Sequence, residues 1–233
     1  MINVLNPSNH ANPILAVDLG LICIDEGVLK VLLMARDDYA EVGGAWALPG
    51  GIVHIDETLN QTATRVLKTK AKLDQFHLEQ LETFGELNRD PRGRVVSVAY
   101  FALTPHVQRL KEATEHDDLT LAVINLSAKV GDQTVSVLSE NGQNLGLAFD
   151  HDIIINRIIT RLKGKLDYTP IALSLLPEHF TLREVQQVFE TIQATSFAKP
   201  AFRRKVLDRN IFHPTGLLET ASNFRPAELY KRL

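Results

Sequence analysis

The sequence GIVHIDETLNQTATRVLKTKAKL, at residues 51–73, decides how the first part of the chain folds. Asp56 is a suitable N-cap, and apolar residues recur behind it at helical spacing. The stretch therefore predicts an amphipathic helix over residues 57–72. Gly50 and Gly51 precede the helix, and their lack of a side chain lets a ligand approach the backbone closely.

Strand signals surround this helix. Two apolar runs flank Asp25-Glu26-Gly27 and predict a β-hairpin. A loop and strand lead into the helix, and three further strands are expected behind it. The predicted strand regions are residues 14–24, 28–35, 43–51, 81–87, 94–104 and 119–126. A mixed sheet with the helix packed against it predicts an α/β sandwich.

The two parts of the 233-residue chain differ in charge. Residues 1–150 carry 12 Lys and Arg against 20 Asp and Glu, a net charge of −8. Residues 151–233 carry 13 against 8, a net charge of +5. The two parts are therefore expected to meet different partners.

Several classes of protein are not indicated. The single cysteine, Cys23, gives no disulfide framework and fits a reducing compartment. No apolar run approaches the roughly 18 residues of a membrane span, and residues 1–13 form a polar arm without signal-sequence features. The eight histidines include no close pair at metal-ligand spacing, so we predict no metal site. We expect a cytoplasmic protein with no membrane partner.

The second part of the chain predicts helices. Residues 151–165 carry apolar residues at helical spacing and are interpreted as a helix that connects two domains. Thr181 followed by Glu184 predicts a capped helix, and a turn is expected at residues 194–197. A second helix then begins near Pro200. Its apolar residues, Phe202, Val206 and Leu207, are expected to face inward, with basic residues projecting between them.

This arrangement is typical of a DNA-binding domain. A helix, a turn and a basic helix place a recognition helix in the major groove, where arginine suits guanine edges and phosphates. Residues 211–230 predict two short strands around a polar loop, which is a wing. The predicted DNA-binding residues are Lys199, Phe202, Arg203, Arg204, Lys205 and Arg225. The alternative is that the basic residues form only a solvated helix face.

The first part of the chain resembles the Nudix domain. The Nudix box runs Gly, five residues, Glu, seven residues, Arg-Glu-aliphatic, one residue, Glu-Glu, one residue, Gly, aliphatic. Gly51, Glu57, Arg65, Leu67 and Leu73 keep this register. The segment GAWALPGG at residues 44–51 is also similar to Nudix proteins, and RDPRGRVVSVAY at residues 89–100 is similar to members that handle ADP-ribose.

The chain departs from the box where the box binds metal. Val66, Thr69, Lys70 and Lys72 stand in place of three glutamates and a glycine. The first three share one helix face, which holds magnesium in active Nudix enzymes. Valine cannot ligate, threonine is a weak neutral ligand, and the ammonium group of Lys70 would repel the ion. The resemblance therefore implies a nucleotide pocket without catalytic residues, metal or hydrolase activity, in which Lys70 contacts the pyrophosphate.

We predict that this pocket binds ADP-ribose or a related nucleotide. Guanidinium groups suit the diphosphate, and a carboxylate accepts hydrogen bonds from ribose hydroxyls. The candidate residues are Arg36, Trp46, Gly50, Gly51, Glu57, Arg65, Lys70, Arg89, Asp90, Arg92 and Tyr100. Structural alternatives stay open at this point. Glu57 and Arg65 fit an ion pair, Trp46 fits the core, and at least one arginine among residues 89–94 fits a solvated hairpin tip.

A second resemblance spans nearly the whole chain. The segments LAFDH at residues 147–151, FRRKV at 202–206 and RPAELY at 225–230 are similar to the Nudix-related transcriptional regulators of NAD metabolism, the NrtR family. Asn223 and Phe224 depart from the glycine that is common there.

The resemblance implies an α/β fold in which a Nudix α/β/α sandwich with a mixed sheet, residues 1–150, precedes a winged helix-turn-helix domain, residues 151–233. It further implies a homodimeric repressor of NAD-related or sugar-metabolism genes. Such a protein binds a palindromic double-stranded DNA operator, responds to a nucleotide effector and needs no cofactor.

Two other functions are weighed against this one. An active ADP-ribose pyrophosphatase would use magnesium and substitute carboxylates such as Glu112 or Glu115, and release of AMP would identify it. A nucleotide-responsive adaptor would use the basic helix to bind an acidic protein. DNA binding differs from this adaptor function in its steep weakening with ionic strength and in its sequence preference.

Overall fold

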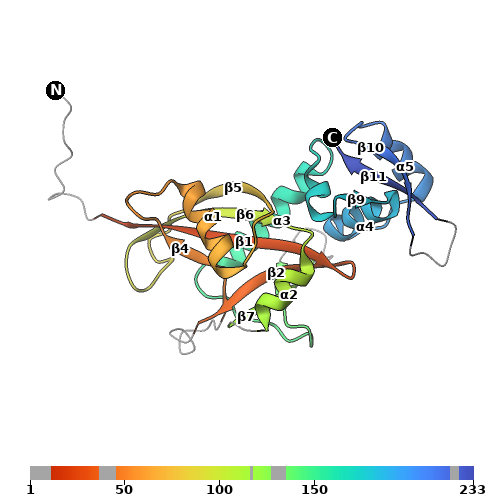
Figure 1. The fold of residues 1–233 in the computed structure, drawn as a ribbon. Helices are drawn as coiled ribbons and strands as arrows, with labels where there is room; N and C mark the ends of the chain where they lie inside the picture. Colours follow the sequence, from red (N-terminus) through yellow and green to blue (C-terminus); the bar gives the residue numbers. More distant parts are fainter. Residues whose placement is uncertain (1–11, 37–45, 116–117, 127–134, 221–225) are drawn as a thin grey trace, which may run out of the picture.

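The computed structural model describes residues 12–36, 46–115, 118–126, 135–220 and 226–233 (Figure 1). Within these residues, eight strands form one mixed sheet with the order β5-β6-β1-β2-β7-β8, and β3 and β4 pair with β2 and β1. The strands are β1 Ile14–Asp25, β2 Val28–Ala35, β3 Trp46–Ala47, β4 Gly50–Ile52, β5 His77–Phe84, β6 Val95–Leu103, β7 Leu119–Leu126 and β8 Val135–Leu138. The predicted mixed sheet is confirmed. The third predicted loop and strand region begins among residues 37–45, outside the described residues.

The central hairpin forms where the sequence predicts it. Strand β1 pairs antiparallel with β2 and parallel with β6, so it lies inside the sheet. Glu26 and Gly27 have φ angles of 51° and 79°. Two consecutive residues with positive φ suit the tight turn of a hairpin, because that turn matches the twist of the strands.

Helices α1 (Leu59–Lys70) and α2 (Val107–Thr114) cover one face of the sheet. The N-cap of α1 is Thr58, whereas the sequence predicted Asp56. The Thr58 side chain accepts the Gln61 backbone N–H, and the Gln61 side chain accepts the Thr58 N–H. This capping box satisfies two donors at once and sets the helix start two residues later than expected. The sequence did not predict α2, β8 or the start of β5 at His77.

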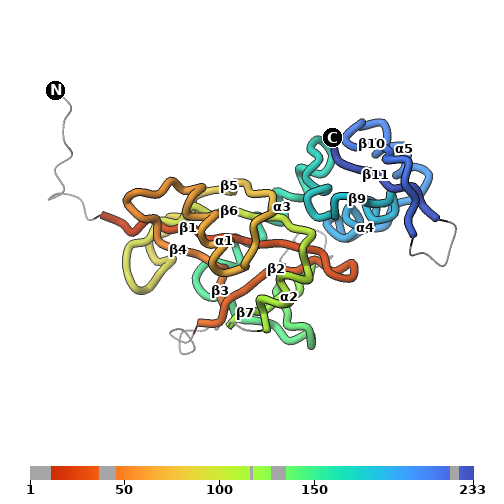
Figure 2. The backbone as a smooth tube through the Cα atoms, in the orientation of Figure 1, coloured from red at the N-terminus to blue at the C-terminus, as the bar shows by residue number. Residues whose placement is uncertain are grey.

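Helix α3 (His151–Lys165) covers the opposite face. It is a layer of the sandwich as well as the predicted connector. Its buried apolar side chains pack in one continuous core with the sheet and with the C-terminal helices. They are Ile154, Ile155, Ile158, Ile159 and Leu162. Figure 2 shows the chain passing from the sheet through α3 into the C-terminal domain.

The C-terminal domain is a winged helix. It contains the 3-10 helix η3 Ile171–Leu175, helices α4 Leu182–Gln193 and α5 Lys199–Leu207, and a sheet with the order β10-β11-β9. The strands are β9 His179–Phe180, β10 Phe212–Leu218 and β11 Glu228–Arg232. The predicted capping box between Thr181 and Glu184 is confirmed. Strand β9 was not predicted.

Aromatic side chains fill the core of this domain. Phe202 of α5 packs edge-to-face on Phe189 of α4, and Phe180 and Tyr230 pack edge-to-face on Phe212. Leu207, which was expected to face inward, is 39% exposed, because α5 ends there. Among the described residues, no helix is both long and apolar enough to cross a membrane.

Gly20 sets how closely α3 approaches the sheet. A Cβ atom at this position would lie 2.1 Å from the Ile158 Cδ1 atom. We predict that Gly20→Ala lowers the free energy of unfolding by about 1–3 kcal/mol through overpacking. Ile158→Val removes the clashing methyl group, so the double variant should lose less than the sum of the two single losses. Urea denaturation measures all three.

Gly164 provides a matched control for the same substitution. It lies in α3, and a Cβ atom there would meet nothing within 4 Å beyond the backbone of its own helix. Gly164→Ala should therefore stabilise the protein by about 0.5–1 kcal/mol through helix propensity. A loss of stability at both glycines would contradict the packing argument.

Candidate ligand pocket and nucleic-acid interface

A cavity of about 790 Å³ opens beside the N-terminal half of β1. Its wall combines β1, the end of β2, β4, the loop after Asn88 and the start of α3. Seven of the predicted ligand-binding residues line it, namely Arg36, Gly50, Gly51, Lys70, Arg89, Asp90 and Arg92. Its other polar residues are Asp18 and His151, and Phe149, Met34 and Ile14 are among the apolar ones.

A buried ion-pair group built on Arg89 forms the floor of this cavity. Arg89 Nη2 lies 2.9 Å from Asp18 Oδ2 and 2.6 Å from Asp150 Oδ1, and Arg89 Nε donates to Asp150 Oδ2 at 2.9 Å. The Arg89 side chain is only 4% exposed. Buried charges are tolerated when they are paired and hydrogen-bonded, so these contacts fix the floor in one geometry.

His151 completes the floor. Its Nδ1 accepts the Leu48 backbone N–H at 2.9 Å, which leaves the ring proton on Nε2, and Nε2 lies 3.6 Å from Asp18 Oδ1. Burial alone would raise the pKa of the Asp18 carboxyl. A hydrogen bond from His151 and the charge of Arg89 outweigh burial and hold that pKa well below its usual range. Asp18 is therefore an anion at neutral pH.

Two cations lie close to the ring of Phe149 at the cavity. The guanidinium carbons of Arg36 and Arg92 lie 5.2 and 5.3 Å from the centre of its ring, within reach of a cation–π interaction. Arg92 also donates two hydrogen bonds to Asp90, at 3.0 and 2.8 Å. The ring and the carboxylate thus hold both guanidinium groups at the cavity, where they suit a polyanion.

The two glycines are required by packing inside the protein. A Cβ atom on Gly50 would lie 2.8 Å from both the Asp18 Oδ1 atom and the Val17 carbonyl oxygen. A Cβ atom on Gly51 would lie 3.2 Å from Val66 Cγ2. Both glycines line the cavity, but close approach of β4 to β1 and α1 already explains them.

Four predicted ligand-binding residues are not among those that line the cavity: Trp46, Glu57, Arg65 and Tyr100. Trp46 is partly buried and packs against the core. Tyr100 is 2% exposed, lies in the core and donates its hydroxyl to Gln80. Tyr100 is therefore a core residue in this structure, and Trp46 packs against the core.

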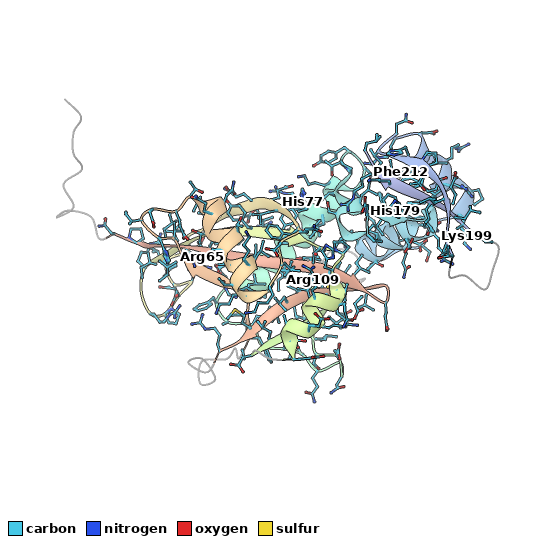
Figure 3. All side chains as sticks on the ribbon, viewed as in Figure 1. Arg65, His77, Arg109, His179, Lys199 and Phe212 are labelled. Carbon is cyan, nitrogen blue, oxygen red and sulfur yellow. The ribbon has the colours of Figure 1, made fainter. Side chains whose placement is uncertain are left out.

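Arg65 of α1 forms an ion pair with Glu57 in the loop before this helix. Arg65 Nε and Nη2 donate to the two Glu57 carboxylate oxygens at 2.6 and 2.8 Å, and Nη2 also reaches the Ile52 carbonyl at 3.1 Å. Thr62 donates its hydroxyl to Glu57 at 2.9 Å. The pair therefore ties the loop before α1 to strand β4. Figure 3 labels Arg65 on α1.

The positions that hold magnesium in active Nudix enzymes do not fit that ion here. Val66 is 2% exposed and packs in the core, and Thr69 donates its hydroxyl to the Arg65 carbonyl at 2.8 Å. Lys70 lines the cavity. Magnesium prefers several oxygen ligands in octahedral geometry, which these side chains cannot provide. Neither Glu112 nor Glu115, the substitute carboxylates considered above, is among the residues that line the cavity.

The sequence reasoning missed Asp18, Asp150 and His151. The signal for Asp18 was present, because a charged residue inside a strongly apolar strand needs a buried partner. Its partner, Arg89, was predicted as a ligand contact. The pairing joins positions 71 residues apart, and the local sequence does not reveal it.

Helix α5 presents an exposed basic surface. Lys199, Arg203, Arg204 and Lys205 are all exposed. Figure 3 shows Lys199 on the side of the winged helix remote from the large sheet. Lys205 Nζ lies 2.7 Å from Asp167, an exposed pair that water and salt weaken. The surface can therefore offer its cations to a negatively charged partner.

Of the other two predicted DNA-binding residues, Phe202 faces inward as the apolar pattern predicts, and Arg225 is not tested. Phe202 is 4% exposed and packs against Phe189 and Phe197, so it stabilises α5 from the core and is not on the surface. Arg225 lies outside the described residues. Arg209, the last cation of the basic segment, donates to the carbonyls of Leu166 and Thr169 at 2.6 and 2.7 Å and holds the end of α5 in place.

Comparisons with known proteins match both parts of the chain. The family model of the NUDIX domain matches residues 15–131, and that of the NrtR DNA-binding winged helix domain matches residues 172–232. An "ADPR responsive transcriptional repressor NtrR" from Acinetobacter baylyi is 34% identical over 229 residues, which cover 96% of this chain and 84% of that protein.

Two further matches differ in how much of this chain they cover. An ADP-ribose pyrophosphatase from Methanocaldococcus jannaschii is 31% identical over 147 residues, 63% of this chain and 73% of that protein. The crystal structure of Shewanella oneidensis NrtR complexed with a 27mer DNA is similar with a TM-score of 0.77 and 32% identity, over 94% of this chain and 93% of that one. The second match spans both domains in the same order.

The ion pair on α1 predicts a pH dependence of stability. Hydrogen bonds from Arg65, which outweigh the opposing effect of burial, lower the pKa of Glu57 from 4.5 to about 2. A lowered pKa in the folded state adds stability that is present above pH 4.5 and is lost as the pH falls toward 2. We predict that Glu57→Gln lowers the Tm at pH 7 and that its difference from wild type shrinks toward pH 2.

Thermal unfolding followed by circular dichroism at several pH values measures this difference. A Tm difference that stays constant from pH 7 to pH 2 would show that Glu57 acts through packing and not through its charge.

Proposed function

This chain belongs to the NrtR family, in which a Nudix domain precedes a winged helix, and we propose that it represses transcription in response to ADP-ribose. One observation carries the proposal. A cavity rich in arginine and lysine lies beside a helix whose metal-binding positions are Val66, Thr69 and Lys70. Such a site suits recognition of a diphosphate better than its hydrolysis.

ADP-ribose suits the cavity in size and in charge. The volume of about 790 Å³ lies within the usual range for small-molecule sites, roughly 300–1,000 Å³. Arg36, Arg92 and Lys70 line the cavity and would hold the diphosphate, and Asp90 would accept hydrogen bonds from a ribose. Phe149 and neighbouring apolar side chains offer surface for the base. The name of the Acinetobacter relative supports this choice of effector.

We propose that the bound nucleotide is released intact. In this chain Lys70 supplies a fixed positive charge on the face where active Nudix enzymes hold magnesium. The ammonium group can contact the diphosphate but cannot activate a water molecule as a metal ion does. The protein therefore needs no cofactor for its response, and its domain 1–150 acts as the sensor.

The winged helix, within residues 151–233, is proposed to bind operator DNA in the cytoplasm. The exposed cations of α5 would enter the major groove, and the wing would contact the backbone, with Arg225 as a proposed contact. A homodimer presents two such helices, which read a palindrome with half-sites about one helical turn, roughly 34 Å, apart. Genes of NAD-related or sugar metabolism are the proposed targets.

The effector site is tested with a matched pair of lysines. Lys70 lines the cavity, whereas Lys68 is exposed on the same helix and is not among the lining residues. We predict that Lys70→Ala weakens ADP-ribose binding about tenfold, close to 1.4 kcal/mol, and that Lys68→Ala changes it less than twofold. Isothermal titration calorimetry measures both.

The same samples test the absence of hydrolysis. Wild-type protein incubated with magnesium and ADP-ribose should release no AMP at ordinary enzyme rates. Rapid AMP release would support the pyrophosphatase alternative, and equal affinity of the two lysine variants would remove Lys70 from the site.

The DNA interface is tested after selection of bound DNA from a random pool, which should return a palindrome. We predict that Arg204→Ala weakens binding to this DNA at least about tenfold and reduces the slope of log K against log salt by about one. Arg183→Ala is the control, because Arg183 is exposed on α4 and pairs with Glu219. Fluorescence anisotropy at several salt concentrations measures both.

An equal loss in the two arginine variants would show only a general charge effect. A pool that returns no preferred sequence, together with binding to acidic proteins, would favour the adaptor function.

A further inference from the structure

The tip of the β1–β2 hairpin contacts the winged helix directly. Thr191 of α4 donates its hydroxyl to the Gly27 carbonyl at 3.0 Å, across 164 positions of the chain. A Cβ atom on Gly27 would lie 2.6 Å from Gln187 Nε2, so α4 lies directly against the turn. The hairpin tip lies beside α4 in Figure 1.

The tip is held in place by ion pairs at its base. Asp25 accepts hydrogen bonds from Lys30 at 2.9 Å and from Lys111 of α2 at 3.0 Å. Lys30 also reaches Glu140 at 2.9 Å, and its side chain is only 10% exposed. These contacts tie the turn to α2 and to the segment after β8. Movement at the tip therefore requires movement of β1 and β2 themselves.

The other end of β1 forms the cavity. Ile14, Ala16 and Asp18 line it, and Asp18 holds the buried Arg89. The strand is paired with β6 along residues 14–22 and with β2 along residues 22–25. A strand with partners along its length is stiff, so a shift that a ligand imposes at Asp18 is carried toward the tip.

Helix α4 in turn carries the recognition helix. Phe189 of α4 and Phe202 of α5 pack with their ring centres 5.2 Å apart. The Glu190 carboxylate accepts the Phe197 backbone N–H at 2.8 Å, and Gln186 donates to the Phe197 carbonyl at 2.9 Å. The turn between the two helices is therefore fixed to α4, and α5 moves with it.

Helix α3 attaches the winged helix to the large sheet through one continuous apolar core. Apolar packing is not directional, so it tolerates small changes of orientation. The hydrogen bond between Gly27 and Thr191 is a directional contact between the two domains outside this core. The orientation that it favours decides whether two recognition helices match two half-sites.

We propose that the Thr191–Gly27 hydrogen bond couples the occupancy of the cavity to the position of α5. This inference rests on the proposed function, because it concerns how ADP-ribose changes operator affinity. A ligand alters DNA binding only through unequal affinity for two arrangements, and this contact distinguishes the two. Thr191 is a positioning residue that touches neither ligand nor DNA.

The experiment measures a ratio, the operator Kd with saturating ADP-ribose divided by the operator Kd without it. Thr191→Val keeps the shape of the side chain and removes the donor, whereas Thr191→Ser keeps the donor. Thr160→Val is the control, because the Thr160 hydroxyl donates within α3, to the Asn156 carbonyl at 2.9 Å. The full-length protein and the selected operator are used throughout.

We expect the ratio for Thr191→Val to move about fivefold toward one, which corresponds to roughly 1 kcal/mol for a single neutral hydrogen bond. The ratios for Thr191→Ser and Thr160→Val should stay at the wild-type value. By reciprocity, the ratio of ADP-ribose affinities between free and operator-bound protein should shrink by the same factor in Thr191→Val and stay at the wild-type value in the other two variants. A merely structural role of Thr191 would change the operator affinities with and without ADP-ribose equally and leave their ratio unchanged. A changed ratio therefore identifies a role in coupling.

A wild-type ratio in Thr191→Val, or an equal change in its two operator affinities, overturns the inference. If wild-type protein fails to bind ADP-ribose or DNA, the proposed function fails instead. If Thr191→Val does not unfold cooperatively, Gln187→Ala takes its place. Gln187 is exposed on α4 over the same turn, and an unchanged ratio there overturns the inference as well.

Discussion

Burial of α3 between the large sheet and the winged helix is the constraint on which the rest of this structure depends. Its four buried isoleucines and Leu162 join a core that runs without interruption from β1 to Phe202 and Tyr230. Each such side chain contributes roughly 1.5–3 kcal/mol when it leaves water. The winged helix is therefore held against the large sheet by packing. A displacement of the sheet consequently displaces the winged helix as well.

The buried Arg89 group links the ligand pocket to the same helix. Asp18 belongs to β1, and Asp150 is the N-cap residue of α3, so one guanidinium bridges the strand and the helix that both lead to the winged domain. A diphosphate that enters the cavity meets a cation whose hydrogen bonds are already used by two carboxylates. Any competition for Arg89 would therefore act directly on the start of α3 and on β1, which both lead to the winged helix.

Much of the fold was predictable because its turns and helix caps depend on residues close together in the sequence. The pocket was less predictable because its residues pair across long stretches of the chain. The hairpin turn, the Thr181–Glu184 capping box and the basic helix each depend on residues close in sequence, and the sequence predicted all three. Arg65 and Arg89 look alike in the sequence, yet one clamps a loop to β4 and the other forms the cavity floor. Helix α2 was not predicted because it is short and polar, and because its N-cap residue, His106, makes no capping hydrogen bond with its side chain.

The residues of the Nudix box that remain in this chain are those that hold the fold together. Glu57 and Arg65 clamp the loop to β4, Leu67 and Leu73 are fully buried, and Gly51 lies against the helix. The residues that are missing are those that would face a metal ion, and even Lys72 keeps the left-handed backbone, with a φ of 53°, that favours the glycine of the pattern. The chain thus keeps the residues of the box that stabilise the fold and carries apolar and basic side chains on the face that would bind metal. Recognition without catalysis requires this combination.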